Sequence, residues 1–288
     1  MNSLPLPARW ICPSCRHENS ALEYCPACGE RYLNPHRLSL TSLAEQAVES
    51  LFHADGRILR TVTALLRQPG RLTQSWMHGE RRGLMAPFQL FLFLNVIFFF
   101  AQSLSGLSVL ATPLDTHLHH MQYAPLAQRL IDSHLASHGG TLAQLTPLFD
   151  RQQSTNAKLL VFAMVPLFAL TLRLLFPLRR RLGAIHLVYA LHFYAYLMAC
   201  LTLLFPIAGL LLLLLRQLGV AFEPTLFDDA ASLIELALIV IYHWLAIDRV
   251  YSLKTPRRIA SVMVLAAAVL PILVAYRLFL FCVTLYEI

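Results

Sequence analysis

The sequence predicts an all-α integral membrane protein of about five transmembrane helices, preceded by a small N-terminal β module. Of its 288 residues, 57% are hydrophobic and only 14% are charged, whereas soluble domains are about 45–50% apolar and about 25% charged. The apolar residues also gather in runs long enough to cross a bilayer. These observations exclude an ordinary soluble protein. The N-terminus carries cysteines and charges where a signal peptide needs an apolar core, so we expect the first span to act as a signal anchor.

Three regions follow one another along the chain. Residues 1–36 form a polar module, 37–85 are expected to form cytoplasmic amphipathic helices, and 86–288 form the transmembrane domain, because periodic apolar residues give way to continuous apolar runs. The predicted spans are 87–106, 158–177, 184–215, 230–247 and 259–282, with an outer loop at 107–157 that contains a helical pattern between Leu118 and Leu135.

The distribution of charge fixes the expected orientation. The 184–215 run exceeds the roughly 20 residues that cross a bilayer, so it could be one tilted helix or two short ones bent at Pro206 and Gly209. With five spans and the N-terminus inside, 17 of the 23 basic residues lie on inner segments and three on outer ones. Splitting the run would place the basic residues of 248–258 outside, against the positive-inside rule. We therefore predict one span, either straight or bent at Pro206, with a cytoplasmic N-terminus and an external C-terminus.

Four cysteines near the N-terminus carry the most specific motif in the chain. Cys12 and Cys15 form one CxxC pair, and Cys25 and Cys28 form a second pair nine residues later. Two such pairs place four thiolates around one tetrahedral ion, which favours Zn²⁺ or iron, and zinc is the default for a ribbon. We predict one structural zinc ion in a zinc ribbon over 1–36. A redox dithiol is the alternative, although a thioredoxin-like βαβ pattern is lacking.

A resemblance to a known family rests on the segment that precedes the first span. Leu65-Leu66-Arg67-Gln68-Pro69-Gly70, then Trp76-Met77-His78-Gly79-Glu80-Arg81-Arg82 and Ala86-Pro87-Phe88, follow the cysteine pairs and lead into an apolar run. With these features the chain resembles a bacterial family of uncharacterised membrane proteins, catalogued as a domain of unknown function, number three-six-six-seven. The resemblance implies a zinc ribbon joined to an inner-membrane helical domain, and it implies no activity.

Residues near the expected membrane surface are candidates for lipid or partner contact. Trp76, Gly79, Arg81 and Arg82 stand just before the first span. Two arginines at this level can bind lipid phosphates. The alternative is that they only determine the topology of the chain.

Polar residues inside the predicted spans form a second candidate site. Arg173, His192, Glu235 and Arg277 lie within apolar runs, where a charge is costly unless it is paired. Glu235 and Arg277 have similar expected depths and could pair. Such residues indicate either a substrate or proton path or polar contacts that hold helices together.

Histidines in the outer loop are a weaker candidate for metal binding. His117, His119, His120, His134 and His138 lie there with Asp115 and Asp132. Histidine is the commonest metal ligand, but the HExxH pattern of a metalloprotease is absent.

We expect a non-enzymatic, membrane-anchored binding or scaffolding protein, because four thiolates close the metal site and no acid–base constellation accompanies it. The expected partners are the lipid bilayer and a protein that docks on the ribbon through Trp10, Tyr24 and Tyr32. The basic residues are too few, and too near the spans, to indicate nucleic acid. The alternatives are a transporter or channel that uses Glu235, Arg277 and His192, and a membrane metalloenzyme that uses the outer histidines.

Overall fold

The computed structural model of the protein describes residues 9–20, 23–29, 32, 56–105, 110–177, 183–218 and 224–288. Within these residues the elements, in chain order, are β1 (Trp10–Ile11), β2 (Glu18–Asn19), α2 (Arg57–Arg67), α3 (Arg71–His78), α4 (Pro87–Ser105), α5 (Leu114–His119), α6 (Ala124–His138), α7 (Leu142–Leu160), the 3-10 turn η2 (Val161–Ala163), α8 (Met164–Leu175), α9 (Gly183–Gln217), α10 (Pro224–Tyr251) and α11 (Thr255–Glu287). The amphipathic stretch expected between Leu40 and Leu51 lies outside the described residues.

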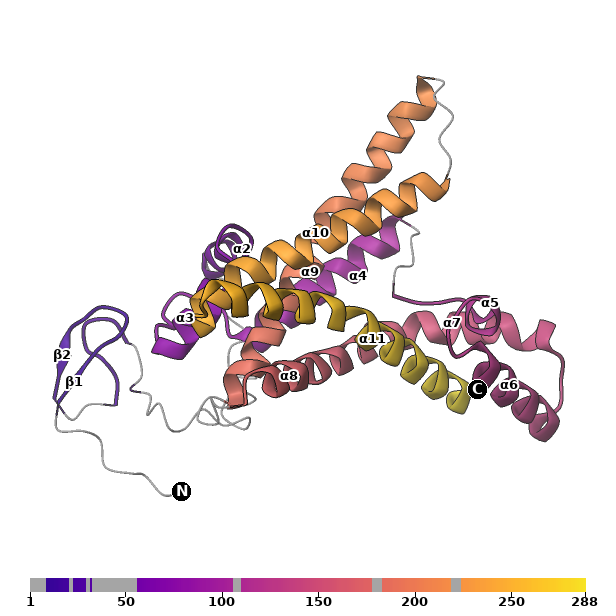
Figure 1. The fold of residues 1–288 in the computed structure, drawn as a ribbon, viewed down its shortest axis with the longest axis horizontal. Coiled ribbons are helices and arrows are strands. Elements are labelled where there is room, and N and C mark those ends of the chain that lie inside the picture. The colour runs from indigo at the N-terminus through magenta and orange to yellow at the C-terminus, as the bar shows by residue number, and fades with distance from the viewer. Residues whose placement is uncertain are drawn as a thin grey trace.

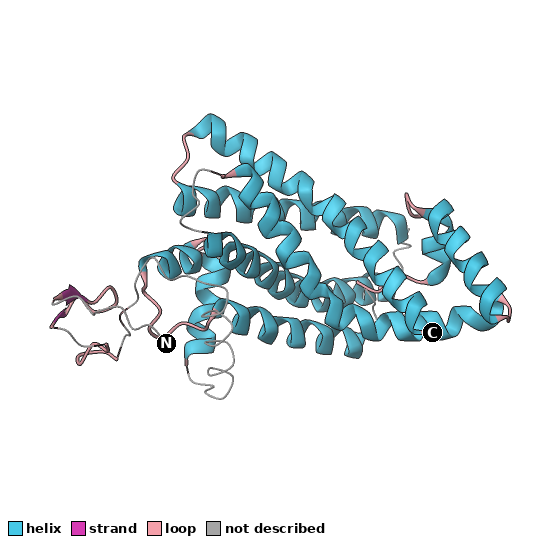
Figure 2. Cartoon of the chain, turned by 90° about the horizontal axis from the view of Figure 1, so that it is seen from below, coloured by secondary structure: helices cyan, strands magenta, loops and turns pink. Residues whose placement is uncertain are grey.

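The fold is mainly helical, with a two-stranded sheet at the N-terminal end (Figure 1). Figure 2 shows the same arrangement from below, with the sheet beside the helices. Five helical stretches of the described chain are long and apolar enough to cross a membrane. They are Pro87–Leu104, Leu142–Leu175, Ala184–Leu204, Ala230–Tyr251 and Thr255–Glu287. The predicted fold class is therefore confirmed.

Helix α9 is the centre of the bundle. Helices α4 and α8 make the most extensive contacts with it, and α2, α3 and α10 also pack against it. Its apolar window Ala184–Leu204 is 72% buried, against 28–39% for the other four windows, because aromatic and small residues face several neighbours at once. The helix continues through Pro206 without a break, so the 184–215 run forms one helix.

The second apolar stretch begins earlier than the sequence indicates. Helices α7, η2 and α8 follow one another from Leu142 to Leu175, whereas the expected span starts at residue 158. The N-terminal half of α7 is amphipathic and buries Leu145 and Phe149 against the C-terminal end of α11. Because its other face is polar, a search for continuous apolar residues does not detect this half of the helix.

The segment expected as an outer loop folds into helices. Helix α5, helix α6 and the start of α7 form a cap beside the C-terminal end of α11 (Figure 1). Leu114, Ala127 and Ile131 join Phe149 and Phe281 in one buried cluster. The helical pattern expected between Leu118 and Leu135 falls on two helices, since the chain turns at residues 120–123. We call residues 114–160 together with this end of α11 the outer cap.

The α2–α3 pair packs on the bundle through a tight turn at Pro69-Gly70. Gly70 has φ of 84°, and a Cβ atom built there would lie 2.6 Å from the Cα atom of Ala246 on α10. Arg249 of α10 donates a hydrogen bond of 2.8 Å to the carbonyl oxygen of Pro69. Only glycine permits this backbone conformation and this close approach together. The turn is therefore the point at which the α2–α3 pair docks on α10.

Candidate functional site

Two tight turns present the four N-terminal cysteines. Strands β1 and β2 pair antiparallel, with Trp10 opposite Asn19. In the first turn the Cys12 N–H donates to the carbonyl oxygen of His17 at 2.9 Å. In the second, the Gly29 N–H donates to the carbonyl oxygen of Cys25 at 2.7 Å, and Gly29 adopts φ of 73°. The hairpin and its neighbouring turn thus aim both CxxC pairs at one point.

The four sulfur atoms converge on a site that could bind a metal ion. All four lie within 4.8 Å of one another, and they are the only group of three or more metal-ligating side chains within the described residues. The Sγ atoms of Cys12 and Cys28 are 3.5 Å apart, and those of Cys15 and Cys25 are 3.6 Å apart. All four are free thiols. The two shortest contacts each join a cysteine of one pair to a cysteine of the other, as one shared cation requires.

Burial and the close approach of the thiols shift the pKa values of Cys12 and Cys25 in opposite directions. Burial raises the pKa of Cys12 to about 12. Burial acts in the same direction on Cys25, but the backbone N–H of Ala27 and the neighbouring cysteines outweigh it and lower the pKa of Cys25 to about 6. Four thiolates within this distance repel one another unless a cation lies between them.

The aromatic residues of the ribbon differ in exposure. Trp10 is only 8% exposed, since it packs on Cys12 and Cys25 and contacts the Tyr32 ring at 5.2 Å. The expectation that Trp10 is available to a partner is therefore wrong. Tyr24 is 54% exposed, as expected, and Ile11 is 65% exposed. Among the described residues beside the cysteines, the large exposed apolar side chains are Ile11 and Tyr24.

The ribbon lies against the end of α3. The nearest atom to a Cβ built on Gly79 is Cγ of Pro13, in the first cysteine turn, at 3.4 Å. Gly79 ends α3 with φ of 80°. The indole of Trp76 is buried against Ala184, Ile185 and Val188 of α9. The guanidinium of Arg81 lies 4.0 Å from the centre of the Trp76 ring, and Arg82 is exposed. Of these four candidate contact residues, Arg82 is the one on the surface.

Three hydrogen-bonded pairs connect helices in the interior of the bundle. The hydroxyl of Thr73 on α3 lies 2.8 Å from Nδ1 of His192 on α9. The Tyr189 hydroxyl lies 2.9 Å from Nδ1 of His243, and the Tyr251 hydroxyl lies 2.8 Å from Nδ1 of His186. Sequence reasoning identified His192 but missed Thr73, His186 and Tyr251. No local signal could have found these pairs, because their members lie 54–119 residues apart.

The Thr73 hydroxyl stabilises the docking of α3. Both Thr73 and His192 are buried, so Thr73→Val leaves Nδ1 of His192 without its hydrogen bond at nearly unchanged volume. We expect a loss of about 1–3 kcal/mol of stability, measured as the unfolding free energy of the purified protein in mild denaturant. Thr146→Val on the exposed face of α7 is the control, and an equal loss there would contradict the assignment.

Several buried polar atoms near these pairs have no hydrogen-bond partner within the described residues. They are Nε2 of His192, Nε2 of His243, and the hydroxyls of Tyr194 and Tyr242. His243 stacks on Phe168 and Tyr189, so its free nitrogen lies among aromatic rings. Unsatisfied polar atoms of this kind are costly and are found at functional sites more often than elsewhere.

The other polar residues predicted inside the spans do not join His192. Arg173 is exposed in the last turn of α8. Glu235 lies half-buried on α10, and Arg277 lies half-buried on α11 with its Nη1 4.0 Å from the sulfur of Met121. Both side chains belong to the described residues, and no ion pair within 4 Å joins them. The charge of Arg277 nevertheless acts on Glu235, so the two residues interact electrostatically without direct contact, while the Arg277 side chain also reaches Met121 of the outer cap.

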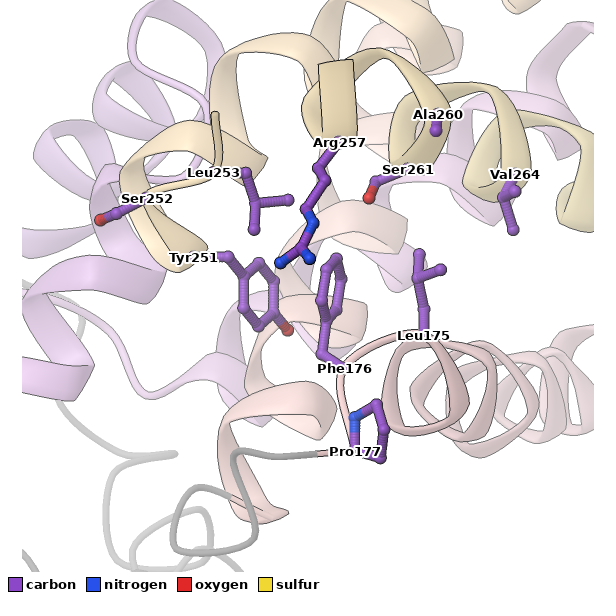
Figure 3. Close-up of a pocket in the computed structure, with 10 residues that line it drawn as sticks. All are labelled: Leu175, Phe176, Pro177, Tyr251, Ser252, Leu253, Arg257, Ala260, Ser261 and Val264. Carbon is purple, nitrogen blue, oxygen red and sulfur yellow. The ribbon is translucent and has the colours of Figure 1, made fainter. Parts of the chain in front are cut away.

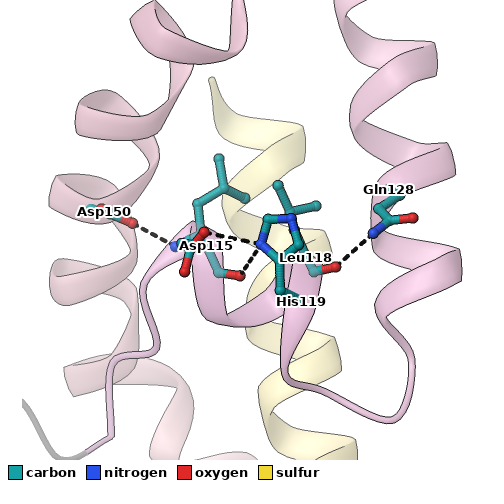
Figure 4. A network of polar contacts seen from close by, with 6 residues as sticks. Asp115, Leu118, His119, Gln128 and Asp150 are labelled. Atoms are coloured by element: carbon teal, nitrogen blue, oxygen red, sulfur yellow. Dashed lines mark hydrogen bonds and ion pairs between the residues drawn. The ribbon is translucent and has the colours of Figure 1, made fainter.

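The outer-cap histidines do not converge on a metal site in the described structure. His119 contacts Asp115 at 3.0 Å on the surface, next to the bonds that Asp150 and Gln128 make to the backbone of α5 (Figure 4). His134 and His138 stack on each other one helical turn apart. His117 points inward, where Tyr123 and Gln153 occupy its two nitrogens at 2.8 and 2.7 Å. Within the HxHH pattern, His117 therefore lies in the interior and His119 lies on the surface.

His117 makes the outer cap sensitive to acid. Burial, helped by the charge of Arg277, lowers the pKa of His117 from its ordinary value of 6.5 to about 4. The hydrogen bond to Gln153 acts in the opposite direction, but burial and the Arg277 charge outweigh it. Between pH 6.5 and pH 4 the unfolded chain binds a proton at His117 that the folded cap does not bind. The contribution of His117 to the stability of the cap is therefore complete above pH 6.5 and is lost as the pH falls toward 4.

Hydrogen exchange of residues 114–153 tests this dependence locally. Protection should fall between pH 6.5 and pH 4, after correction for the intrinsic pH dependence of exchange. His117→Gln should flatten the pH dependence, and His119→Gln, on the surface, should preserve it. If the pH dependence of protection were unchanged in His117→Gln, a group other than His117 would be responsible for it.

Comparison with protein families finds one match in the segment that contacts α9 and α10. Residues 55–99 match the family model described as "Protein of unknown function (DUF3667)". The predicted resemblance is confirmed over this segment, which contains α2, the Pro69-Gly70 turn, α3 and most of α4. No curated protein and no solved structure matches the chain.

Proposed function

We propose that this protein is a multi-pass protein of the bacterial inner membrane whose zinc-loaded cytoplasmic ribbon docks a partner protein. One observation carries the proposal: four sulfur atoms close the metal site, while Ile11 and Tyr24 beside it are largely exposed. A site with four protein ligands has no open position for substrate, so its role is structural. The exposed apolar surface that it holds in place is what a partner would contact.

Zinc suits the spacing of the sulfur atoms. Tetrahedral Zn–S bonds of about 2.3 Å put sulfur atoms about 3.8 Å apart, close to the 3.5 and 3.6 Å of the two shortest pairs. Four thiolate ligands favour zinc or iron, and zinc is the usual ion of a ribbon built from two CxxC turns.

The charge distribution supports a cytoplasmic ribbon. Seventeen of the 23 basic residues lie on segments that a five-span topology with the N-terminus inside places in the cytoplasm. This orientation puts the C-terminus and the outer cap outside. In this proposal the bilayer surrounds the apolar helices.

The contact between Pro13 and Gly79 joins the ribbon to the bundle. Gly79 ends α3, and α3 bears Thr73, which is bound to His192. A protein that binds the ribbon therefore acts on a helix whose other contacts lie inside the membrane domain. In this proposal the protein is a membrane anchor that holds its partner at a fixed place, rather than an enzyme.

Site-specific photocrosslinking in intact cells tests the partner proposal. A photoreactive amino acid at Ile11 should give a crosslinked protein species that Cys25→Ser abolishes. The same amino acid at Tyr286, which is 92% exposed near the C-terminus, is the control. The species should also bind the purified chain, and Ile11→Asp should weaken that binding about tenfold or more. The proposal would be overturned if Ile11 and Tyr286 gave the same crosslinked species, or if Cys25→Ser did not abolish the species formed at Ile11.

Transport is the second candidate function, and the unpartnered Nε2 atoms of His192 and His243 favour it. Buried histidines can relay protons between the two sides of a membrane. Vesicles containing the purified protein and an internal pH-sensitive dye test this function. His192→Asn and Glu235→Gln should each reduce proton flux at least about tenfold, with Arg82→Gln as the control. Equal flux in empty vesicles, wild type and variants would exclude it.

A further inference from the structure

A cavity of about 510 Å³ opens where three apolar helices end together. Helix α8 ends at Leu175, α10 ends at Tyr251, and α11 begins at Thr255. The residues that line the cavity are Leu175, Phe176, Pro177, Tyr251, Ser252, Leu253, Arg257, Ala260, Ser261 and Val264 (Figure 3). Its size falls within the range of about 300–1,000 Å³ that is usual for small-molecule sites.

Arg257 gives the cavity its charge. Its guanidinium reaches down toward the rings of Tyr251 and Phe176 (Figure 3). Within the described residues it makes no ion pair or hydrogen bond, whereas the neighbouring Arg258 binds Asp248 at 3.5 Å and the carbonyl oxygen of Trp244 at 2.6 Å. None of the ten lining residues is acidic. Among the described residues, the cavity therefore offers one positive charge and no negative charge to neutralise it.

The polar groups beside Arg257 suit a phosphate. Ser261 brings a hydroxyl near Arg257, whereas the hydroxyl of Ser252 points away from it (Figure 3). The first turns of α11 lie here as well, and the N-terminal end of a helix favours anions. Phe176 and Tyr251 stack at 4.1 Å and form a flat apolar surface next to the guanidinium (Figure 3). A guanidinium can bind a phosphate through two parallel hydrogen bonds.

The remaining wall suits a hydrocarbon chain. Leu175 of α8, Leu253 between α10 and α11, and Val264 of α11 line the cavity. Since the apolar stretches stop at Leu175 and Tyr251, a bilayer around them would place its phosphate groups at the level of Arg257 and its acyl chains beside Val264. An amphiphile with an anionic head would match both parts of the cavity at once.

We propose that this cavity binds the phosphate head group of an anionic glycerophospholipid, with Arg257 holding the phosphate and Leu175, Leu253 and Val264 contacting the start of an acyl chain. The proposal rests on the membrane placement described above, but not on the ribbon or its partner. Lipid bound here would bridge α8, α10 and α11 at one end of the bundle.

Native mass spectrometry of the full, metal-loaded chain in neutral detergent tests the proposal. Phosphatidylglycerol should bind at least about tenfold more tightly than phosphatidylcholine with the same acyl chains. Arg257→Gln should weaken phosphatidylglycerol binding about tenfold, the effect of removing one charge-assisted contact. Lys254→Gln removes the same charge from an exposed residue three positions away that does not line the cavity, and it should change binding less than twofold.

A second pair of variants tests the apolar part of the cavity without changing charge. Val264→Trp should fill the cavity and weaken phosphatidylglycerol binding about tenfold. Met263→Trp, on an exposed neighbouring residue outside the cavity, should leave binding unchanged. Both substitutions affect exposed side chains, so the fold should survive them.

Three results would overturn the proposal. Equal loss in Arg257→Gln and Lys254→Gln would indicate attraction to surface charge alone. Equal binding of the two lipids, which share the phosphate, would exclude recognition of the net negative charge of an anionic head group. Displacement of the lipid by excess glycerol phosphate in solution would identify a soluble organophosphate as the ligand. Metal content, measured on the same samples, distinguishes these results from failure of the ribbon.

Discussion

Replacing Cys25 with serine is expected to remove the metal from the protein and to unfold the ribbon. Cys25 is buried within a cluster whose four sulfur atoms lie within 4.8 Å of one another. A structural zinc site contributes roughly 10–16 kcal/mol to the folding of a small domain. In the described part of the ribbon the buried apolar cluster is small, with Trp10, Cys12 and Cys25 buried and Cys28 and Tyr32 packed against them. The loss should be the largest of any single substitution described for this chain.

Elemental mass spectrometry and limited proteolysis together measure this effect. The metal content should fall from about one zinc per chain to nearly none, and new cleavage should appear within residues 9–29. The helical signal in circular dichroism should persist, because the membrane helices pack independently of the cysteines. Cys282→Ser, at an exposed cysteine outside the cluster, is the matched control. Full metal content in Cys25→Ser would show that the sulfur atoms do not form the site.

Gly70→Ala is expected to detach the α2–α3 pair from the bundle. Alanine pays about 1–2 kcal/mol for the left-handed backbone conformation that Gly70 adopts. Its Cβ atom would also lie 2.6 Å from the Cα atom of Ala246, and that contact is with backbone, which cannot rotate away. Overpacking costs a further 1–3 kcal/mol or so. We expect a total loss of about 2–5 kcal/mol, measured by chemical unfolding in detergent.

Gly56→Ala is the control for this effect. Gly56 precedes α2 with φ of −51°, and nothing lies within 4 Å of a Cβ built there. Its substitution should change stability by less than about 0.5 kcal/mol. Ala246→Val, on the other side of the contact, should reproduce the loss seen in Gly70→Ala. Stability unaffected by either change would mean that the turn does not dock on α10.

Local patterns in the sequence predict the ribbon and the number of apolar helices. The spacing of Cys12, Cys15, Cys25 and Cys28 alone is enough to bring four sulfur atoms together, because each CxxC pair closes its own turn. The five apolar stretches are equally local, since a helix in a bilayer satisfies its own backbone hydrogen bonds. Both predictions depend on residues close together along the chain.

Contacts between distant segments could not be predicted in this way. Trp76 and its neighbours have the composition of an interfacial helix, yet α9 buries the indole. Thr73 carries no sign that His192 is its partner, 119 residues away. Within the run Lys254–Arg258, Arg257 and Arg258 look alike in sequence. The structure separates them, because only Arg258 reaches Asp248 and Trp244.

The docking of the Pro69-Gly70 turn also orders the assembly of the chain in time. Its hydrogen-bond partner Arg249 is synthesised 180 residues later. At about 5–20 residues per second, the turn waits roughly 9–36 seconds on the ribosome before α10 exists to receive it. The segment that matches the family is therefore synthesised early, but its packing against the bundle is completed late. Until then it stays open to chaperones and to the insertion machinery, and its docking marks the moment at which the bundle closes.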